Sequence, residues 1–322
     1  WISSLIILSF TLIYVLFGGL KATIRSDGIQ FIAIILLFFY LIFALFFQNN
    51  NNLNLNIFEE NFIKFDSKSL ITSFQFGFVF FIAVAATNLF HQGNWQRVYA
   101  AKSEKILVKS LLISFFIIFV IVLGLGLTGS ISKLNGLKFN EDLAFFSIIL
   151  NKSDIFVSLI VLIFSLCLTI STVDTLLNSI SSLTIVHSKD FFNFKYLKDK
   201  KLSNVILILL SILCLVIALY QLSVLYLFLL ADLLCCACVY VIFKGFYQKK
   251  IYPSQSFILI MIGLSLGLLF FPSMDFSKSL LIGVIFDKSN FNEIFTNSLL
   301  FWSFLFATFS PIFFDTIYRR IK

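Results

Sequence analysis

Long apolar runs recur along the whole 322-residue sequence, and they constrain the fold more than any other feature. Each approaches or exceeds the roughly 18 residues that a helix needs to cross a bilayer. Their approximate bounds are 1–18, 28–47, 70–91, 106–128, 155–186, 203–220, 223–243, 254–272 and 294–318. Hydrophobic residues make up 60% of the chain and charged residues 12%, whereas a soluble domain has about half and about a quarter. The sequence therefore predicts an all-α polytopic membrane protein with about nine transmembrane helices.

Basic residues are distributed unevenly between the loops that join these runs. One alternating set of loops, which includes residues 319–322, holds 17 of the 24 lysines and arginines. Because such loops stay on the cytoplasmic side, we expect a cytoplasmic C-terminus and a first run that passes from outside to inside. The net charge of +8 is then a topology signal, and we expect no nucleic-acid partner. The asparagine-rich segment 48–62 is expected to be external.

The chain is expected to be one transmembrane domain, 1–322, in the plasma or bacterial inner membrane. It begins at Trp1 inside an apolar run, without the charged segment of a signal peptide. We therefore expect further helices before Trp1. No HExxH, GxSxG or phosphate-binding glycine loop is present, so an enzyme is not predicted.

The segment STVDTLLNSISS, residues 171–182, places many polar side chains inside one apolar run. At about 100° per residue, Ser171, Thr175, Asn178 and Ser182 fall on one helical face, with Asp174 at its edge. Close helix packing explains any one small hydroxyl residue. A continuous polar stripe beside a carboxylate favours a site for a hard cation or a polar solute.

Polar residues also occur at the end of the run 70–91. Thr87, Asn88, His91 and Gln92 recur at helical spacing before Gly93, which is compatible with a broken helix. Alternatively, the helix ends near Asn88 and the rest is interfacial, an environment that suits Arg97.

Two further carboxylates and a cysteine cluster lie in or beside the apolar runs and are candidates for a cation or metal site. The segment 18–30, GGLKATIRSDGIQ, predicts a cytoplasmic hairpin in which Asp27 either helps to cap the next helix or lies at the inner mouth of a cation pathway. Asp232 lies in mid-run, so it must be protonated, face water or meet a partner on another helix. The CCAC segment, 235–238, favours helix packing over a metal site.

Three segments together resemble the sodium:solute symporter family. They are YVLFGGLKATIRSDGIQ (14–30), NWQRVYAAKS (94–103) and STVDTLLNSISSLTIVHSKDFF (171–192), which occur in the family's order and at fitting separations. The resemblance implies a leucine-transporter-type fold of two inverted five-helix repeats. On that mapping the chain carries a partial fold, from the fourth core helix onward.

The resemblance also implies roles for individual residues. Leu168, through its carbonyl, and Ser171 and Thr172, through their hydroxyls, match sodium ligands, and Asp27 matches an acid involved in cation coupling. The stretch with Thr87, Asn88, His91 and Gln92 is implied to face or gate the substrate. Asp174, Thr175, Asn178 and Asp232 are further candidates for coupling. Aromatic residues of the sugar-carrying members are replaced here by Ala86 and Thr87, so an amino acid, a urea-like compound or another small organic solute is expected.

The expected function is sodium-coupled symport of a small organic solute by alternating access. Its partners would be the solute, Na⁺ and the lipid bilayer, with no organic cofactor. Protons remain an alternative to sodium as the coupling ion. A transporter-like membrane sensor module of a signalling protein is the alternative function. A passive channel is disfavoured because the sequence has no repeated charged ring or carbonyl filter.

Overall fold

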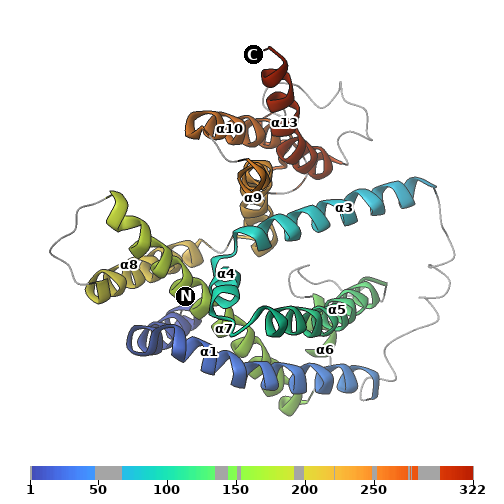
Figure 1. The fold of residues 1–322 in the computed structure, drawn as a ribbon. Coiled ribbons are helices and arrows are strands. Elements are labelled where there is room, and N and C mark those ends of the chain that lie inside the picture. Colours follow the sequence, from blue (N-terminus) through green and yellow to red (C-terminus); the bar gives the residue numbers. More distant parts are fainter. Residues whose placement is uncertain are drawn as a thin grey trace. The chain divides into compact units, whose positions relative to one another are not determined.

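A computed structural model describes residues 2–47, 67–134, 144–150, 154–191, 199–220, 222–248, 252–274, 276, 278–281 and 298–321. Over these ranges the chain is helical and contains no strand (Figure 1). The helices are α1 (Ile2–Phe47), α3 (Ser67–Phe90), α4 (Gln92–Ala100), α5 (Glu104–Leu134), α6 (Ala144–Leu150), α7 (Ile155–Phe191), α8 (Asp199–Leu219), α9 (Val224–Tyr247), α10 (Pro253–Phe270) and α13 (Leu299–Ile321). The asparagine-rich segment 48–62 lies outside the described residues.

Eight of these helices are long and apolar enough to cross a membrane. The apolar part of α1 alone has 42 residues, or about 63 Å at 1.5 Å per residue, which is twice the thickness of a bilayer core of about 30 Å. It therefore contains the first two predicted runs. The prediction of an all-α polytopic protein is confirmed, and the chain is a multi-pass membrane protein. The inverted-repeat arrangement stays a prediction.

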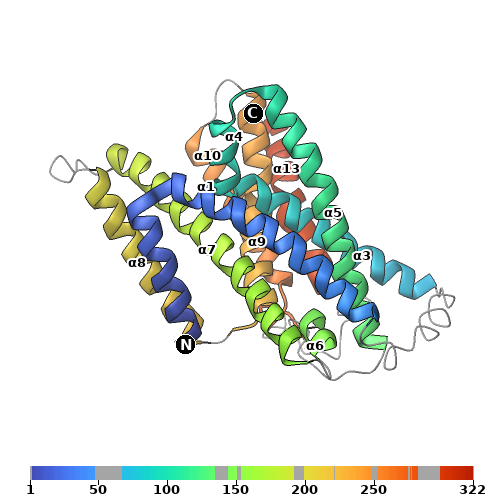
Figure 2. The ribbon, with the colours of Figure 1, turned by 90° about the horizontal axis from the view of Figure 1, so that it is seen from below.

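The break in α1 differs from the predicted hairpin. Only Gly19 leaves helical geometry, with φ 52° and ψ −147°, and the helix bends between its two halves (Figure 2). Positive φ is accessible to glycine because it has no Cβ. The predicted loop over 18–30 is thus wrong, because the chain returns to helix directly after Gly19. Ser26 and Asp27 lie inside the helix instead of capping it.

The described residues divide into two compact units. The first comprises residues 1–63 and 92–221, and the second residues 64–91 and 222–322. In the first unit α7 lies against α1, α4, α6 and α8, and α1 also contacts α8. Its apolar interior includes Phe38 and Leu41 of α1 and Phe164 of α7, all nearly inaccessible. The prediction of a single domain over 1–322 stays a prediction.

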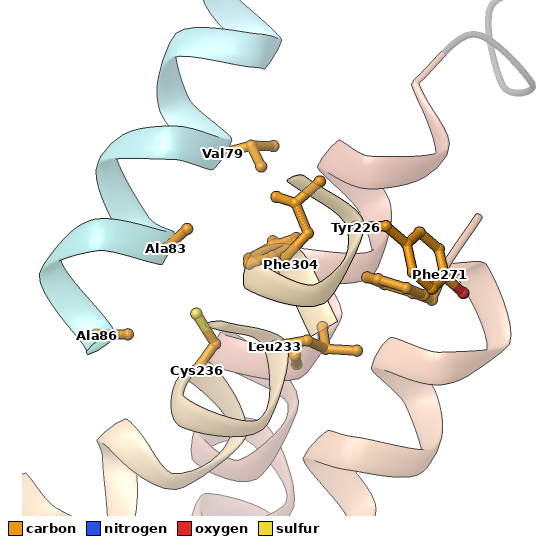
Figure 3. Packing of buried hydrophobic residues seen from close by; sticks show 10 residues of the cluster. Val79, Ala83, Ala86, Tyr226, Leu233, Cys236, Phe271 and Phe304 are labelled. Atoms are coloured by element: carbon orange, nitrogen blue, oxygen red, sulfur yellow. The ribbon is translucent and has the colours of Figure 1, made fainter. Parts of the chain in front are cut away.

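The second unit is built around α9, which contacts α3, α10 and α13. Ala83 and Ala86 of α3 face Leu233 and Cys236 of α9, and Phe304 of α13 belongs to the same cluster (Figure 3). Small residues on α3 let its backbone approach α9 closely, as is common where membrane helices meet. Cys236 of the CCAC segment is fully buried in this packing.

Helices α10 and α13 run antiparallel and touch at two glycines. A Cβ at Gly263 would lie 2.8 Å from the Ala307 carbonyl oxygen, and one at Gly267 would lie 2.9 Å from the Ala307 Cβ. Gly267 also accepts a 2.8 Å hydrogen bond from the Ser303 hydroxyl. Glycine is needed at both positions because a Cβ would overlap the Ala307 carbonyl oxygen at Gly263 and the Ala307 side chain at Gly267.

Candidate functional site

The polar stripe of α7 lies on the inner side of that helix. Asp174 is fully buried and Ser181 nearly so, whereas Leu176, Ile180 and Leu183 are each more than a third exposed. Several polar side chains therefore face the helices of the first unit, whereas Thr172 is exposed, and the apolar Leu177 is buried with Val15 and Leu207. Asn178 of the predicted polar face is buried, and Asp174 lies in the interior and not at the edge of the stripe.

Asp174 accepts hydrogen bonds from hydroxyl groups on both halves of α1. The Tyr14 hydroxyl, before the break at Gly19, donates to Oδ2. The Ser26 hydroxyl, after the break, lies 3.1 Å from the same oxygen. The adjacent Thr175 hydroxyl contacts Oδ1 at 3.2 Å. Asp174 therefore joins the two halves of α1 to α7, and no lysine or arginine of the described residues pairs with it.

A second carboxylate, Asp27, lies where α1, α4 and α7 meet. Arg97 Nη2 of α4 lies 2.6 Å from Asp27 Oδ2 and 3.0 Å from the Thr175 hydroxyl oxygen. The Ser171 hydroxyl donates to Asp27 Oδ1 at 2.8 Å. The side chain of Asp27 is 19% exposed and that of Arg97 47%. We name the set Asp27, Arg97, Ser171, Asp174 and Thr175 the carboxylate pair site.

The four predicted sodium ligands lie in this region. The Thr172 hydroxyl donates to the Leu168 carbonyl oxygen at 2.9 Å, within one turn of α7. Ser171 contacts Asp27, as described above. The Leu168 carbonyl and the Thr172 hydroxyl thus bond to each other on an exposed part of α7, within one turn of Ser171, and sodium binding itself stays a prediction.

In the second unit, the mid-helix carboxylate Asp232 of α9 meets the Thr87 hydroxyl of α3. Thr87 also donates to its own helix, at 2.9 Å from the Ala83 carbonyl oxygen. Asp232 is 7% exposed, and within the described part of the chain no lysine or arginine forms an ion pair with it. Of the three possibilities for Asp232, the structure shows a partner on another helix.

The remaining predicted residues near Thr87 lie on either side of the break between α3 and α4. Asn88 donates to the Val84 carbonyl oxygen of its own helix at 2.8 Å. The break between α3 and α4 falls at His91, and Gln92 begins α4. Gly93, which we expected to mark the break, lies inside α4 and is buried.

Asn178, the last predicted coupling residue, is mostly buried on α7. Its backbone oxygen accepts a hydrogen bond of 2.8 Å from the Ser182 hydroxyl. It therefore belongs to the polar face that contains Asp174, one turn further along the helix.

Sequence reasoning missed a group of polar residues around Asp315 of α13. This fully buried carboxylate accepts from Lys244 Nζ and Gln255 Nε2, each at 2.7 Å, from the Tyr240 hydroxyl at 2.6 Å, and from Arg319 Nη2 at 2.9 Å. Only the Asp315–Arg319 pair has a local signal, because the two residues are four apart on a helix. The other partners come from α9 and α10, which lie 60 or more residues away in the sequence.

Comparison with known proteins gives one relative. The chain is 26% identical over 247 residues to the spermidine transporter DUR31 of Candida albicans. The match covers 73% of this chain and 44% of that protein, so the chain spans less than half the length of the curated relative that it matches. No protein-family model matches the chain, and no solved structure matches it. The relative is a membrane transporter, and the resemblance to the sodium:solute symporters stays a prediction.

Proposed function

We propose that the protein is a membrane transporter that couples the uptake of a small organic cation to sodium. One observation carries the proposal: two carboxylates, Asp27 of α1 and Asp174 of α7, meet where α1 packs on α7, and Ser171 of α7 donates to the first while Ser26 of α1 donates to the second. Acidic side chains at such positions are costly in a membrane and mark ion or solute pathways. The similarity to a spermidine transporter supports the same function.

The sodium part of the proposal rests on the chemistry around Ser171. Sodium, like other hard cations, prefers oxygen ligands, and carbonyl, hydroxyl and carboxylate groups supply them. The Ser171 hydroxyl now directs its proton to Asp27 Oδ1. Rotation of that hydroxyl would turn its lone pairs toward an ion held by Leu168, Thr172 and Asp27.

The solute part rests on carboxylates that have no basic partner among the residues that the structure describes. Asp174 and Asp232 are buried in membrane helices, and among the described residues each is bonded to hydroxyl groups and not to a lysine or arginine. An ammonium group of a solute would complement either carboxylate through a charge-assisted hydrogen bond. A polyamine, which carries several such groups, is therefore the solute class that we favour over an amino acid or a urea-like compound.

Uptake of labelled spermidine by cells or proteoliposomes that contain the protein tests both parts. We expect uptake in sodium buffer to exceed that in choline buffer. The double variant Ser171→Ala, Thr172→Ala should raise the sodium concentration for half-maximal uptake by about tenfold or more, since lost contacts to a charge are worth about 1.5–3 kcal/mol.

The matched control is Ser165→Ala with Thr169→Ala, on the same helix. Both hydroxyls there donate to carbonyl oxygens of their own helix, so sodium dependence should not change. Uptake that is equal in sodium and choline would refute the coupling, and an absence of spermidine uptake with intact uptake of a neutral solute would refute the solute class.

A further inference from the structure

A groove of about 490 Å³ lies between α10 and α13 in the second unit. Its walls are apolar along most of its length, with Ile258 and Ile262 on α10 and Phe314 and Ile317 on α13. At one end the lining becomes polar, with Tyr252, Ser254 and Gln255. Both walls belong to helices that are apolar enough to span a membrane, so we expect lipid to reach the groove.

The groove lies on the N-terminal side of the glycine contact, since its lining residues on α10 run from Ser254 to Ile262. At Gly263 and Gly267 the backbones touch. Toward the start of α10 the facing positions carry larger side chains, among them Ile258 and Ile317. Gln255 still reaches Asp315 at 2.7 Å, so the polar end of the groove is fixed against α13.

The polar end adjoins a cluster of cations that do not line the groove themselves, because the lining residue Gln255 donates to Asp315, which also pairs with a lysine and an arginine. Two cations, Lys244 and Arg319, share the single carboxylate of Asp315, at 2.7 and 2.9 Å. Arg320 follows directly and is exposed. The start of α10 adds a positive helix end, because Tyr252 provides no side-chain cap for the first-turn amides. An anionic group is the complement of this arrangement.

We propose that the groove binds an anionic phospholipid, with an acyl chain along Ile258 and Ile317 and the phosphate beside Ser254 and Arg319. The loops at this end belong to the basic set expected on the cytoplasmic side, and the cytoplasmic leaflet of a membrane is rich in anionic lipids. The site lies on α10 and α13 and does not depend on the proposed transport activity.

Native mass spectrometry of the purified full-length protein tests this site. Phosphatidylserine and phosphatidylcholine with identical acyl chains serve as probes. We expect retention of phosphatidylserine at a concentration about tenfold lower than that of phosphatidylcholine. Arg320→Gln with Arg319→Gln should remove this preference. Arg320→Gln alone, which leaves the Arg319–Asp315 ion pair intact, should reduce it.

A second pair of variants tests the groove without changing charge. Ile258→Trp should fill the groove and lower retention of both lipids at least fivefold. Phe257→Trp, at the neighbouring exposed position that does not line the groove, should retain phosphatidylserine as the parent does. Equal retention of the two lipids, unchanged retention by Ile258→Trp, or a protein dimer that Ile258→Trp dissociates would each overturn the proposal.

Discussion

At the scale of single residues, the buried carboxylates of this protein are satisfied in two different ways. Asp315 is surrounded by two cations and two neutral donors. Asp174 and Asp232 receive hydroxyl donors instead. A hydroxyl satisfies the hydrogen-bonding capacity of a carboxylate but leaves its charge without a counter-ion. Asp315 therefore suits a structural role, and Asp174 and Asp232 suit the binding of a mobile cation.

Asp232→Asn tests this distinction in the second unit. The amide keeps the shape of the side chain and its contact with Thr87 but removes the charge, so spermidine uptake should fall at least tenfold while the protein remains folded. Asp154→Asn is the control, because Asp154 is exposed just before α7. Initial uptake rates, normalised to the amount of protein in the membrane, provide the measurement. Unchanged uptake in Asp232→Asn would exclude this carboxylate from the cation pathway.

At the scale of secondary-structure elements, glycines decide where helices break and where they touch. Gly19 allows α1 to change direction within one residue, which brings Tyr14 and Ser26 to the same carboxylate of α7. Gly263 and Gly267 instead keep a regular helix and remove side chains from a contact. Glycine thus allows a non-helical backbone conformation in the first unit and close packing of two helices in the second.

Gly19→Ala should destabilise the first unit. Alanine at a φ of 52° costs about 1–2 kcal/mol, and the contact of α1 with Asp174 would weaken as the break shifts. Gly28→Ala is the control, since Gly28 is helical and its Cβ would meet no atom within 4 Å; it should be neutral or stabilising by up to about 1 kcal/mol. Thermal unfolding of the purified protein measures both, and equal midpoints for the two variants would contradict the assigned role of Gly19.

Gly263→Ala should destabilise the contact of α10 with α13. The added methyl group would lie 2.8 Å from the Ala307 carbonyl oxygen and 2.9 Å from Pro311 Cγ. Overpacking of this kind costs about 1–3 kcal/mol. Gly77→Ala on α3 is the comparison in the same unit, because a Cβ there meets nothing within 4 Å. The prediction fails if the two variants unfold at the same temperature.

At the scale of the whole molecule, the distribution of basic residues predicts the direction in which each helix crosses the membrane. The five native cysteines all lie in membrane-spanning helices, which keeps the background of a labelling experiment low. The predicted topology places segment 48–62 outside the cell and the end of α9 in the cytoplasm. A single cysteine added at each of these two places should therefore differ in its reaction with a membrane-impermeant reagent.

In intact cells, a membrane-impermeant maleimide should label Asn50→Cys and not Tyr247→Cys. Tyr247 is 85% exposed, so its position is accessible once the membrane is permeabilised, and labelling after detergent treatment is the control. The reverse pattern would invert the topology, and with it the leaflet assigned to the lipid groove.

The apolar runs alone were enough to predict an all-helical membrane protein, because the length and polarity of such a run are local properties. The sequence also identified the polar face of α7, since helical periodicity follows from the chain alone. Only the tertiary structure showed that Gly19 replaces a loop, that Asp174 binds both halves of α1, and that Asp315 collects donors from α9 and α10. These pairings join residues 60 to 160 positions apart, and their energy depends on which helices pack together. Tertiary packing therefore brings polar residues that are distant in the sequence together in the carboxylate pair site, and it places α10 beside α13 to form the groove.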